Sequence, residues 1–125
     1  MEALFSFSKL KQSIKIALLG IKDAFKKEQT FRFELIYGIV TIILSFLFSL
    51  NAIEFSIILI CIGVTLGFEL LNSQIEKTVD ILKPEFNQQA RTIKDMSAAA
   101  VLIVVIVSII VGILIFLPHL LKLFG

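Results

Sequence analysis

Polar side chains recur between positions 69 and 80, where a long apolar run ends. On a helix that turns about 100° per residue, one side would carry an acidic stripe made of Glu69, Asn72, Ser73, Glu76 and Asp80. At 1.5 Å per residue the stripe is about 16 Å long. Burying a carboxylate in a bilayer costs a few kcal/mol or more, so such groups usually serve a function. The deeper Glu69 could meet a lipid head group, while Glu76 and Asp80 could meet water-soluble ligands.

Further charged residues flank the apolar segments. Glu28 and Glu34 precede the first segment, and Lys94-Asp95 precedes the third. Together with the stripe they form a group rich in hard oxygen ligands. Mg²⁺ prefers such oxygens, typically one or two carboxylates together with substrate phosphates. Because phosphoryl transfer needs metal-bridged phosphates and an acceptor oxygen in line, this chemistry is the one the residues favour.

Other interpretations of these residues stay open at this point. Glu69 could be a paired structural charge or a proton-relay group, and Asp80 and Glu85 could belong to a solvated loop surface. A small oligomeric channel or proton-coupled transporter would also suit an intramembrane glutamate, and it predicts proton flux without ATP. A purely structural membrane subunit predicts that Glu28, Glu76 and Asp95 can be neutralised without harm.

The elements that must position these residues are apolar helices. The chain has 125 residues, 58% of them hydrophobic, with a mean hydropathy of +0.98, which is more apolar than a typical soluble domain. Strand periodicity is absent, and helices satisfy their own backbone in lipid. We therefore predict an all-α membrane protein, a single domain over residues 1–125, with membrane spans at about 33–50, 55–72 and 97–117.

A fourth helix is predicted at about residues 8–27. Apolar residues recur there at spacings of three and four, while Lys11, Lys15, Lys22 and Lys26 fall on another face. An amphipathic helix with a basic side is suited to lying in the head-group plane. It could act only as an anchor on anionic lipid, or it could also form a wall of an active site at the interface.

The basic residues predict the orientation. Before the first span lie Lys9, Lys11, Lys15, Lys22, Lys26, Lys27 and Arg32, and between the second and third lie Lys77, Lys83, Arg91 and Lys94. The link between the first two spans has none. The positive-inside bias therefore places the N-terminus and the second loop in the cytoplasm and the C-terminus outside. His119 is expected at the outer interface, far from the acidic stripe.

Several function classes find no support in the sequence. Gly20 and Lys22 do not form the frame of a phosphate-binding P-loop, and no Cys/His metal spacing or Ser/His/Asp arrangement stands out. Because the basic residues flank membrane spans, nucleic acid is not an expected partner. Gly63 and Gly67 form a GxxxG pattern, which suggests close helix packing within or between subunits.

The stretch "ELLNSQIEKTVD" resembles the signature of the bacterial diacylglycerol kinase/undecaprenol kinase family, E-x-x-N-[ST]-x-x-E-x-x-x-D. The resemblance extends to "KKEQTFRFE" and "KPEFNQQARTIKDMSAAAVL", and so covers nearly the whole chain. It implies a multi-pass kinase of the bacterial cytoplasmic membrane that transfers the γ-phosphate of ATP to a lipid hydroxyl with Mg²⁺. It also implies a homotrimer whose active sites are shared between adjacent subunits.

The resemblance further implies a role for each matching residue. Glu69 would be the general base, and Glu28 and Glu76 would hold the metal. The nucleotide site would comprise Lys9, Glu28, Asn72, Glu76, Asp80, Glu85, Phe86, Asn87, Lys94 and Asp95. Residues near the lipid acceptor would be Lys22, Phe31, Arg32, Glu34, Glu69 and Ala98.

The chain departs from the family pattern at a few positions. Lys9 stands where arginine is frequent, Ile16 replaces an aromatic residue, and Asn87 stands where histidine is common. "KDMSAAAV" and Glu34 resemble the diacylglycerol branch, whereas "CIG" at 61–63, Ala98 and the ending "IVGILIFLPHLL" resemble the undecaprenol branch. The expected acceptor is diacylglycerol, giving phosphatidic acid, with undecaprenol as the alternative.

Overall fold

The computed structural model describes residues 4–125, and within that range every regular element is a helix. The helices are α1 (Phe7–Lys27), α2 (Gln29–Leu47), α3 (Ala52–Leu82) and α4 (Gln88–Phe124). The last three are each long and apolar enough to cross a membrane. The predicted fold class, three membrane helices preceded by an N-terminal helix, is therefore confirmed.

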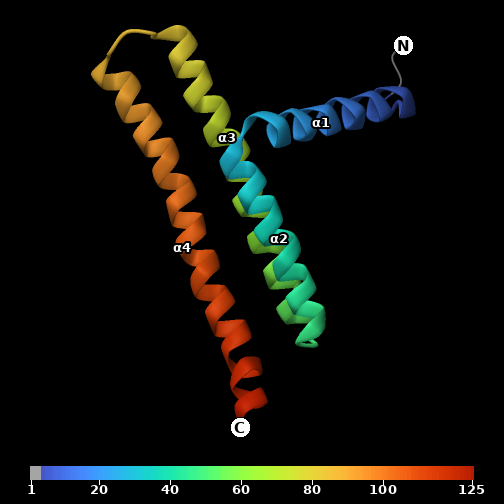
Figure 1. Ribbon diagram of the computed structural model, residues 1–125. Helices are drawn as coiled ribbons and strands as arrows, with labels where there is room; N and C mark the ends of the chain where they lie inside the picture. The colour runs from blue at the N-terminus through green and yellow to red at the C-terminus, as the bar shows by residue number, and fades with distance from the viewer. Residues whose placement is uncertain (1–3) are drawn as a thin grey trace.

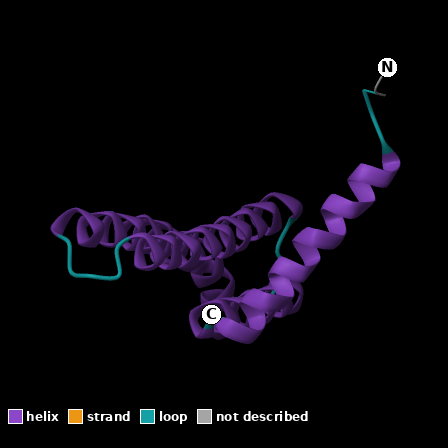
Figure 2. Cartoon of the chain, turned by 90° about the horizontal axis from the view of Figure 1, so that it is seen from above, coloured by secondary structure: helices purple, strands orange, loops and turns teal. Residues whose placement is uncertain are grey.

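The helix α3 is the centre of the arrangement. It packs against α2 and against α4, while α1 contacts α2. Figure 1 shows α2, α3 and α4 running along one another and α1 projecting sideways from the start of α2. The view from above in Figure 2 shows the same separation of α1 from the other helices. This geometry is the one expected for an amphipathic helix that lies across the end of a membrane bundle.

The sharp bend between α1 and α2 is formed by Glu28 and stabilised by Arg32. Glu28 has φ −110° and ψ 105°, so the backbone leaves the helical region for one residue. The Nη1 atom of Arg32 donates to the carbonyl oxygens of Phe25 at 2.9 Å and Lys26 at 3.0 Å. The last carbonyls of a helix have no intrahelical donor, so the guanidinium satisfies two of them. We call residues 25–32 the elbow.

The connection between α2 and α3 is a tight turn followed by a strong helix start. α2 ends at Leu47, before the end of the predicted span, because Ser49 adopts a left-handed φ of 53°. Asn51 then caps α3: its Oδ1 accepts from the backbone N–H of Glu54 at 2.9 Å, and the Glu54 side chain accepts from the Asn51 backbone at 3.1 Å. Such a capping box satisfies two otherwise unpaired donors.

Both α3 and α4 are longer than the spans predicted inside them. α3 has 31 residues, about 46 Å of helix, whereas a hydrocarbon core is about 30 Å thick. No helix breaker occurs before Pro84, so the acidic stripe continues the same helix that crosses the membrane. α4 starts at the Asn87 cap and runs through Pro118 to Phe124, since proline is tolerated in membrane helices.

The close approach between helices occurs at a glycine other than the two in the GxxxG pattern. A Cβ at Gly38 of α2 would lie 2.9 Å from Cγ2 of Ile62 on α3. At Gly63 and Gly67 a Cβ would meet nothing within 4 Å. The expectation of close packing within one chain at these two positions is therefore wrong, and packing between subunits there stays a prediction.

Candidate functional site

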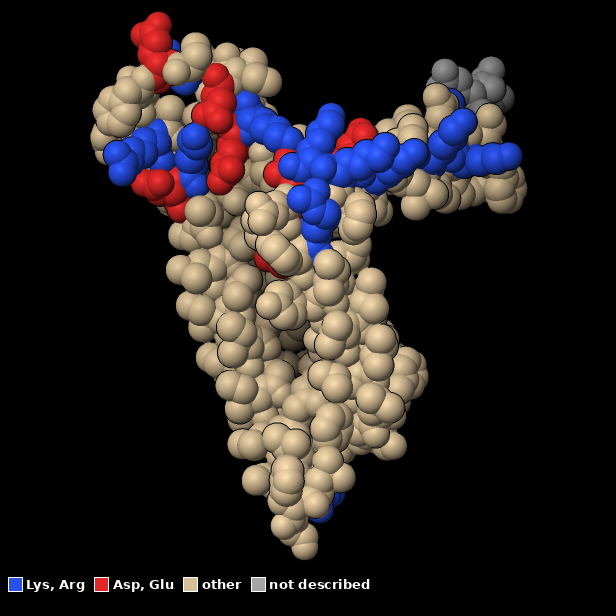
Figure 3. Space-filling model, viewed as in Figure 1, with Lys and Arg blue, Asp and Glu red and all other residues tan. Residues whose placement is uncertain are grey.

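The charged residues gather at one end of the molecule. Figure 3 shows Lys, Arg, Asp and Glu concentrated over α1 and over the end where α3 connects to α4, with a largely uncharged region below. The acidic stripe of α3 lies at this border. Glu69 is 6% exposed and Ser73 is 5% exposed, so the stripe begins inside the protein and emerges toward Asp80, which is exposed.

Other carboxylates influence Glu69. It lies within electrostatic reach of Glu34 on α2, of Glu28 at the elbow and of Glu76 about two turns further along α3. Among the residues described by the structure, Glu69 is the one charged residue that is buried. The fold therefore concentrates negative charge around one enclosed carboxylate, which is where an acceptor proton or a cation would be stabilised.

The two residues predicted to hold a metal come from different elements. Glu28 belongs to the elbow, and its carboxylate forms an ion pair with Lys77 of α3. Glu76 accepts a hydrogen bond from Nδ2 of Asn72 at 3.4 Å. The Oδ1 atom of Asn72 is buried and has no hydrogen-bond partner. The elbow and α3 thus bring oxygen donors toward the same region around Glu69.

These donors fit Mg²⁺ by their chemistry. Carboxylate and amide oxygens are its preferred protein ligands, and the unpartnered Oδ1 of Asn72 is an available oxygen. Nowhere in residues 4–125 do three His, Cys, Asp or Glu side chains form a group that could hold a metal alone. A site with few protein ligands is nevertheless typical of Mg²⁺, which retains water and takes substrate phosphates as ligands.

A second set of predicted residues meets where α3 turns into α4. Lys94 donates to Asp80 at 2.8 Å, and Arg91 lies 3.9 Å from Asp95. The hydrogen bond to Asp80 raises the pKa of Lys94, which precedes the apolar part of α4. A polar pocket of about 410 Å³ is formed here; its lining includes Asp80, Glu85, Phe86, Asn87, Lys94 and Asp95. The pocket is large enough for a small polar ligand.

The predicted lipid-side residues divide into several environments. Phe31 is 3% exposed and Arg32 is engaged with the α1 carbonyls, so both serve the elbow directly. Glu34 has a buried Oε2 atom without a hydrogen-bond partner. Lys22 and Ala98 are exposed. The structure therefore brings Phe31, Arg32 and Glu34 to the elbow and the start of α2, while Lys22 and Ala98 lie on outer surfaces of the chain.

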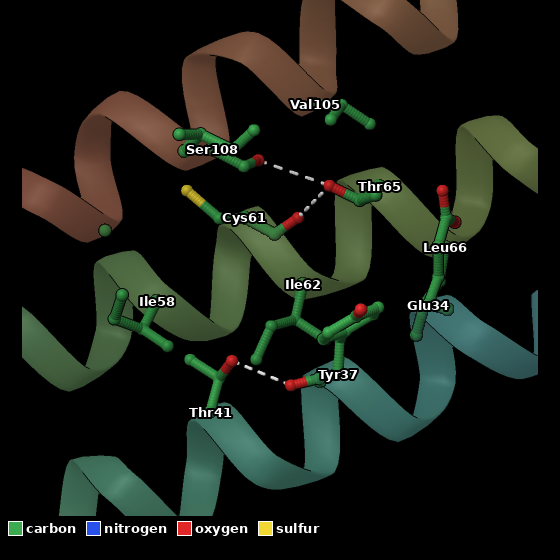
Figure 4. A pocket seen from close by; sticks show the side chains of 13 residues that line it. Glu34, Tyr37, Thr41, Ile58, Cys61, Ile62, Thr65, Leu66, Val105 and Ser108 are labelled. Atoms are coloured by element: carbon green, nitrogen blue, oxygen red, sulfur yellow. Dashed lines mark hydrogen bonds between the residues drawn. The ribbon is translucent and has the colours of Figure 1, made fainter.

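Glu34 also borders an apolar cavity between α2, α3 and α4. The cavity has a volume of about 500 Å³ and extends past Thr41 and Cys61 toward Gly112. Figure 4 shows Glu34 at one end of it and the hydroxyls of Thr65 and Ser108 hydrogen-bonded to each other along its wall, at 3.2 Å. An apolar space with one carboxylate at its end is suited to an amphiphile whose polar group lies near Glu34.

Lys9 is not brought to the acidic stripe within one chain. It lies near the start of α1, and α1 extends away from α3 in Figure 1. About sixteen residues of helix, roughly 24 Å, separate Lys9 from the start of the elbow.

Sequence reasoning missed two pairs that the fold creates. One is Lys77 with Glu28. The other is at the opposite end, where Nε2 of His119 lies 3.1 Å from both carboxylate oxygens of Glu54. The partners in each pair are far apart in the sequence, so no local spacing announces them. One feature of the sequence does point to Lys77: it directly follows Glu76 of the acidic stripe.

Comparison with known proteins finds related sequences over most of the chain. The family described as prokaryotic diacylglycerol kinase matches residues 15–116. The chain is 39% identical over 101 residues to an undecaprenol kinase of Bacillus subtilis, covering 81% of this chain and 82% of that one. It is 35% identical over 101 residues to a diacylglycerol kinase of Haemophilus influenzae, covering 80% and 86%. It is 32% identical over 112 residues to a diacylglycerol kinase of Synechocystis, covering 89% and 64%.

Proposed function

This chain belongs to the prokaryotic diacylglycerol kinase family, and we propose that it transfers the γ-phosphate of ATP to the hydroxyl of a membrane lipid. The observation that carries this proposal is the graded depth of the carboxylates on α3. Glu69 is buried at the end of the apolar region, and Asp80 is exposed beside Lys94 in a polar pocket. A lipid alcohol and a water-soluble nucleotide could therefore meet along one helix.

On this proposal, Glu69 accepts the proton of the lipid hydroxyl. The hydroxyl oxygen then attacks the γ-phosphorus and forms the new phosphate ester, while the bond to the β-phosphate oxygen breaks and ADP leaves. General base catalysis by a positioned carboxylate typically contributes about 10²- to 10⁴-fold to the rate. Burial of Glu69 supports this role, because a buried carboxylate attracts a proton more strongly than an exposed one.

Glu28, Glu76 and the free Oδ1 of Asn72 are the groups that would hold Mg²⁺. The ion would neutralise charge on the phosphates and orient them. Lys94 and Asp95 would position the nucleotide from the α4 side, with Phe86 and Asn87 lining the adjoining pocket. The site would then lie on the cytoplasmic side, where ATP is available, in agreement with the distribution of basic residues.

For the acceptor we propose diacylglycerol, with undecaprenol as the second candidate. Glu34 and the stretch 94–101, apart from Ala98, support diacylglycerol through their resemblance to that branch. The 39% identity with the Bacillus subtilis undecaprenol kinase favours the alternative. The apolar cavity below Glu34 would accept part of an acyl chain or part of a polyprenyl chain.

We also propose that the enzyme is a homotrimer with shared active sites. Lys9 supports this, because within one chain it is remote from the acidic stripe and the α1 helix of a neighbouring subunit could supply it. Large apolar side chains on the membrane helices, such as Ile60 at 64% and Leu114 at 68% exposure, leave ample surface for neighbours. Native mass spectrometry from detergent would show a trimer, whereas a persistent monomer that is active would reject this part of the proposal.

The direct test presents both acceptors side by side. Purified protein in mixed micelles is incubated with γ-labelled ATP, Mg²⁺ and either diacylglycerol or undecaprenol, and the labelled lipids are separated. We expect phosphatidic acid as the faster product. Faster formation of undecaprenyl phosphate would reassign the acceptor, and absence of transfer to both lipids would reject the kinase proposal.

A further inference from the structure

The ion pair between Lys77 and Glu28 joins the elbow to α3 at the edge of the proposed metal site. The Lys77 side chain is 49% exposed and that of Glu28 is 20% exposed, so the pair is more open to solvent than the enclosed Glu69. Lys77 follows Glu76 directly, and Glu28 lies within electrostatic reach of Glu69. A lysine therefore holds one of the two carboxylates that are proposed as metal ligands.

The opposite side of the stripe is arranged in a similar way. Lys94 of α4 holds Asp80 at 2.8 Å. Two lysines thus neutralise acidic groups at the two flanks of the site, while Glu69 and Glu76 between them form no ion pair within the described residues. A site that binds a metal cation and a nucleotide polyanion needs both acidic and basic side chains. Here these acidic and basic side chains form ion pairs with each other.

The pair with Glu28 cannot persist unchanged when a divalent cation binds the same carboxylate. Mg²⁺ lies about 2.1 Å from its ligand oxygens, so the ammonium of Lys77 would be a close cationic neighbour and would be repelled. The flexible four-carbon stem of lysine allows the ammonium to move by several ångströms. Phosphate oxygens bound to the same cation would be the nearest anions available to it, and lysine binds phosphate as a point charge.

We propose that Lys77 is a positioning residue that exchanges partners: it holds Glu28 in the nucleotide-free enzyme and moves to the nucleotide phosphates when Glu28 takes the metal. This inference rests on the proposed function. It assigns Lys77 two opposite effects. Lys77 competes with a metal ion that arrives alone, and it favours a metal ion that arrives with the nucleotide.

A purely structural tie between the elbow and α3 would behave differently. If Lys77 only stabilised the fold, its removal would weaken metal binding and nucleotide binding together, or would leave both unchanged. The partner exchange instead predicts that the two affinities change in opposite directions. This split can be measured without any lipid acceptor.

The experiment compares Lys77→Met with the wild type in the intact protein. Binding of Mn²⁺ alone is followed by the electron paramagnetic resonance signal of the free ion, since Mn²⁺ accepts the same oxygen ligands as Mg²⁺. Binding of a non-hydrolysable ATP analogue with Mg²⁺ is followed by calorimetry. For Lys77→Met we expect Mn²⁺ affinity to rise by up to about fivefold, the range of a partly exposed ion pair, and affinity for the Mg²⁺–nucleotide complex to fall.

The control is Lys15→Met, which removes the same charge from an exposed position of α1 and should change neither affinity. Lys77→Arg keeps the charge and should retain most of the nucleotide affinity. Thermal unfolding of each variant reports whether it is folded. Parallel changes in the two affinities, or no change in either, would overturn the proposal. Failure of the kinase itself would appear separately, as absent lipid phosphorylation by the wild type.

Discussion

Glu69 is held in an environment that a carboxylate alone would avoid. It is 6% exposed, and the charged groups within its electrostatic reach are Glu28, Glu34 and Glu76. A buried negative charge with negative neighbours is costly unless a proton or a cation relieves it. Either form of relief would serve the proposed reaction, since Glu69 would take up the acceptor proton while Mg²⁺ would compensate Glu28 and Glu76.

Replacing Glu69 by glutamine should separate catalysis from binding. The amide keeps the size of the side chain but cannot accept the proton, so we expect turnover to fall by at least about 100-fold, while affinity for Mg²⁺–ATP stays within about twofold. Turnover is measured with labelled ATP and nucleotide binding by calorimetry. Glu54→Gln, at the opposite end of α3, is the matched control. Equal losses of turnover and nucleotide affinity would contradict the assignment of Glu69 as the base.

Replacing Glu76 by glutamine should have the complementary effect. Loss of one proposed metal ligand weakens the Mg²⁺–ATP complex, and we expect its KM to rise by about tenfold, equivalent to about 1.4 kcal/mol. Steady-state kinetics at several Mg²⁺ concentrations measure the change, and excess Mg²⁺ should restore part of the activity. A KM that is unchanged at every Mg²⁺ concentration would remove the metal role of Glu76.

At the scale of elements, the elbow determines where α1 lies. Arg32 donates to the carbonyls of Phe25 and Lys26, and Lys77 binds Glu28. Arg32 is one of the residues predicted to lie near the lipid acceptor. The contacts within one chain show a structural use for it, because they fix the angle at which the amphipathic helix leaves the bundle.

For Arg32→Gln we expect α1 to become less well fixed relative to α2. The shorter, uncharged side chain loses charged hydrogen bonds worth about 1.5–3 kcal/mol each. Spin labels on α1 and on α4, in a chain with Cys61 replaced by alanine, should show a broader distance distribution in the variant. Lys15→Gln on the exposed side of α1 serves as the comparison. A distribution as narrow as that of the parent chain would show that other contacts hold the elbow.

Packing between α2 and α3 depends on Gly38. Because a Cβ there would lie 2.9 Å from Cγ2 of Ile62, and β-branched side chains are stiff in helices, the helices would have to move apart. We expect Gly38→Ala to lower the free energy of unfolding by about 1–3 kcal/mol, measured as a lower midpoint in thermal denaturation. Gly20→Ala, on α1 where a Cβ would meet nothing within 4 Å, should be tolerated. Ile62→Ala should cost less stability in the Gly38→Ala chain than in the wild type. Equal midpoints for Gly38→Ala and Gly20→Ala would show that the contact is unimportant.

Much of the arrangement of the helices could be predicted from the sequence. The features that could not be predicted depend on contacts between distant parts of the chain. Apolar length and charge placement predicted the helices, because a backbone in lipid has few alternatives. The continuous stripe on α3 followed from helical periodicity. The GxxxG pattern at Gly63 and Gly67 predicted close helix packing that the structure does not show within one chain. Small residues permit close packing but do not require it. The pairs of Lys77 with Glu28 and of His119 with Glu54 depend on how helices are placed in space, which local spacing does not encode.

At the scale of the whole molecule, the two ends differ sharply in charge. Charged residues gather at the end with α1 and the α3–α4 connection (Figure 3). Glu54, His119 and Lys122 lie near one another at the other end of α3 and α4. The chain is a multi-pass membrane protein by its family and its apolar helices. Its predicted orientation places the charged end in the cytoplasm, following the positive-inside bias.

Single cysteines can test this orientation. In a chain with Cys61 replaced by alanine, a cysteine at Glu85 should react with a membrane-impermeant thiol reagent only after cells are opened, because the basic end stays inside. A cysteine at Gly125 should react in intact cells. Labelling is measured by mass shift of the purified protein. The reverse pattern would invert the topology and separate the proposed site from ATP.

The unbroken course of α3 couples the two halves of the proposed reaction mechanically. Glu69, Glu76 and Asp80 lie on one continuous helix that is long and apolar enough to cross a membrane. A bilayer thinner than the apolar length of such a helix makes it tilt, and tilting displaces all three side chains together. A change in membrane thickness would therefore move the residue proposed to contact the lipid alcohol and the residues proposed to contact the nucleotide together.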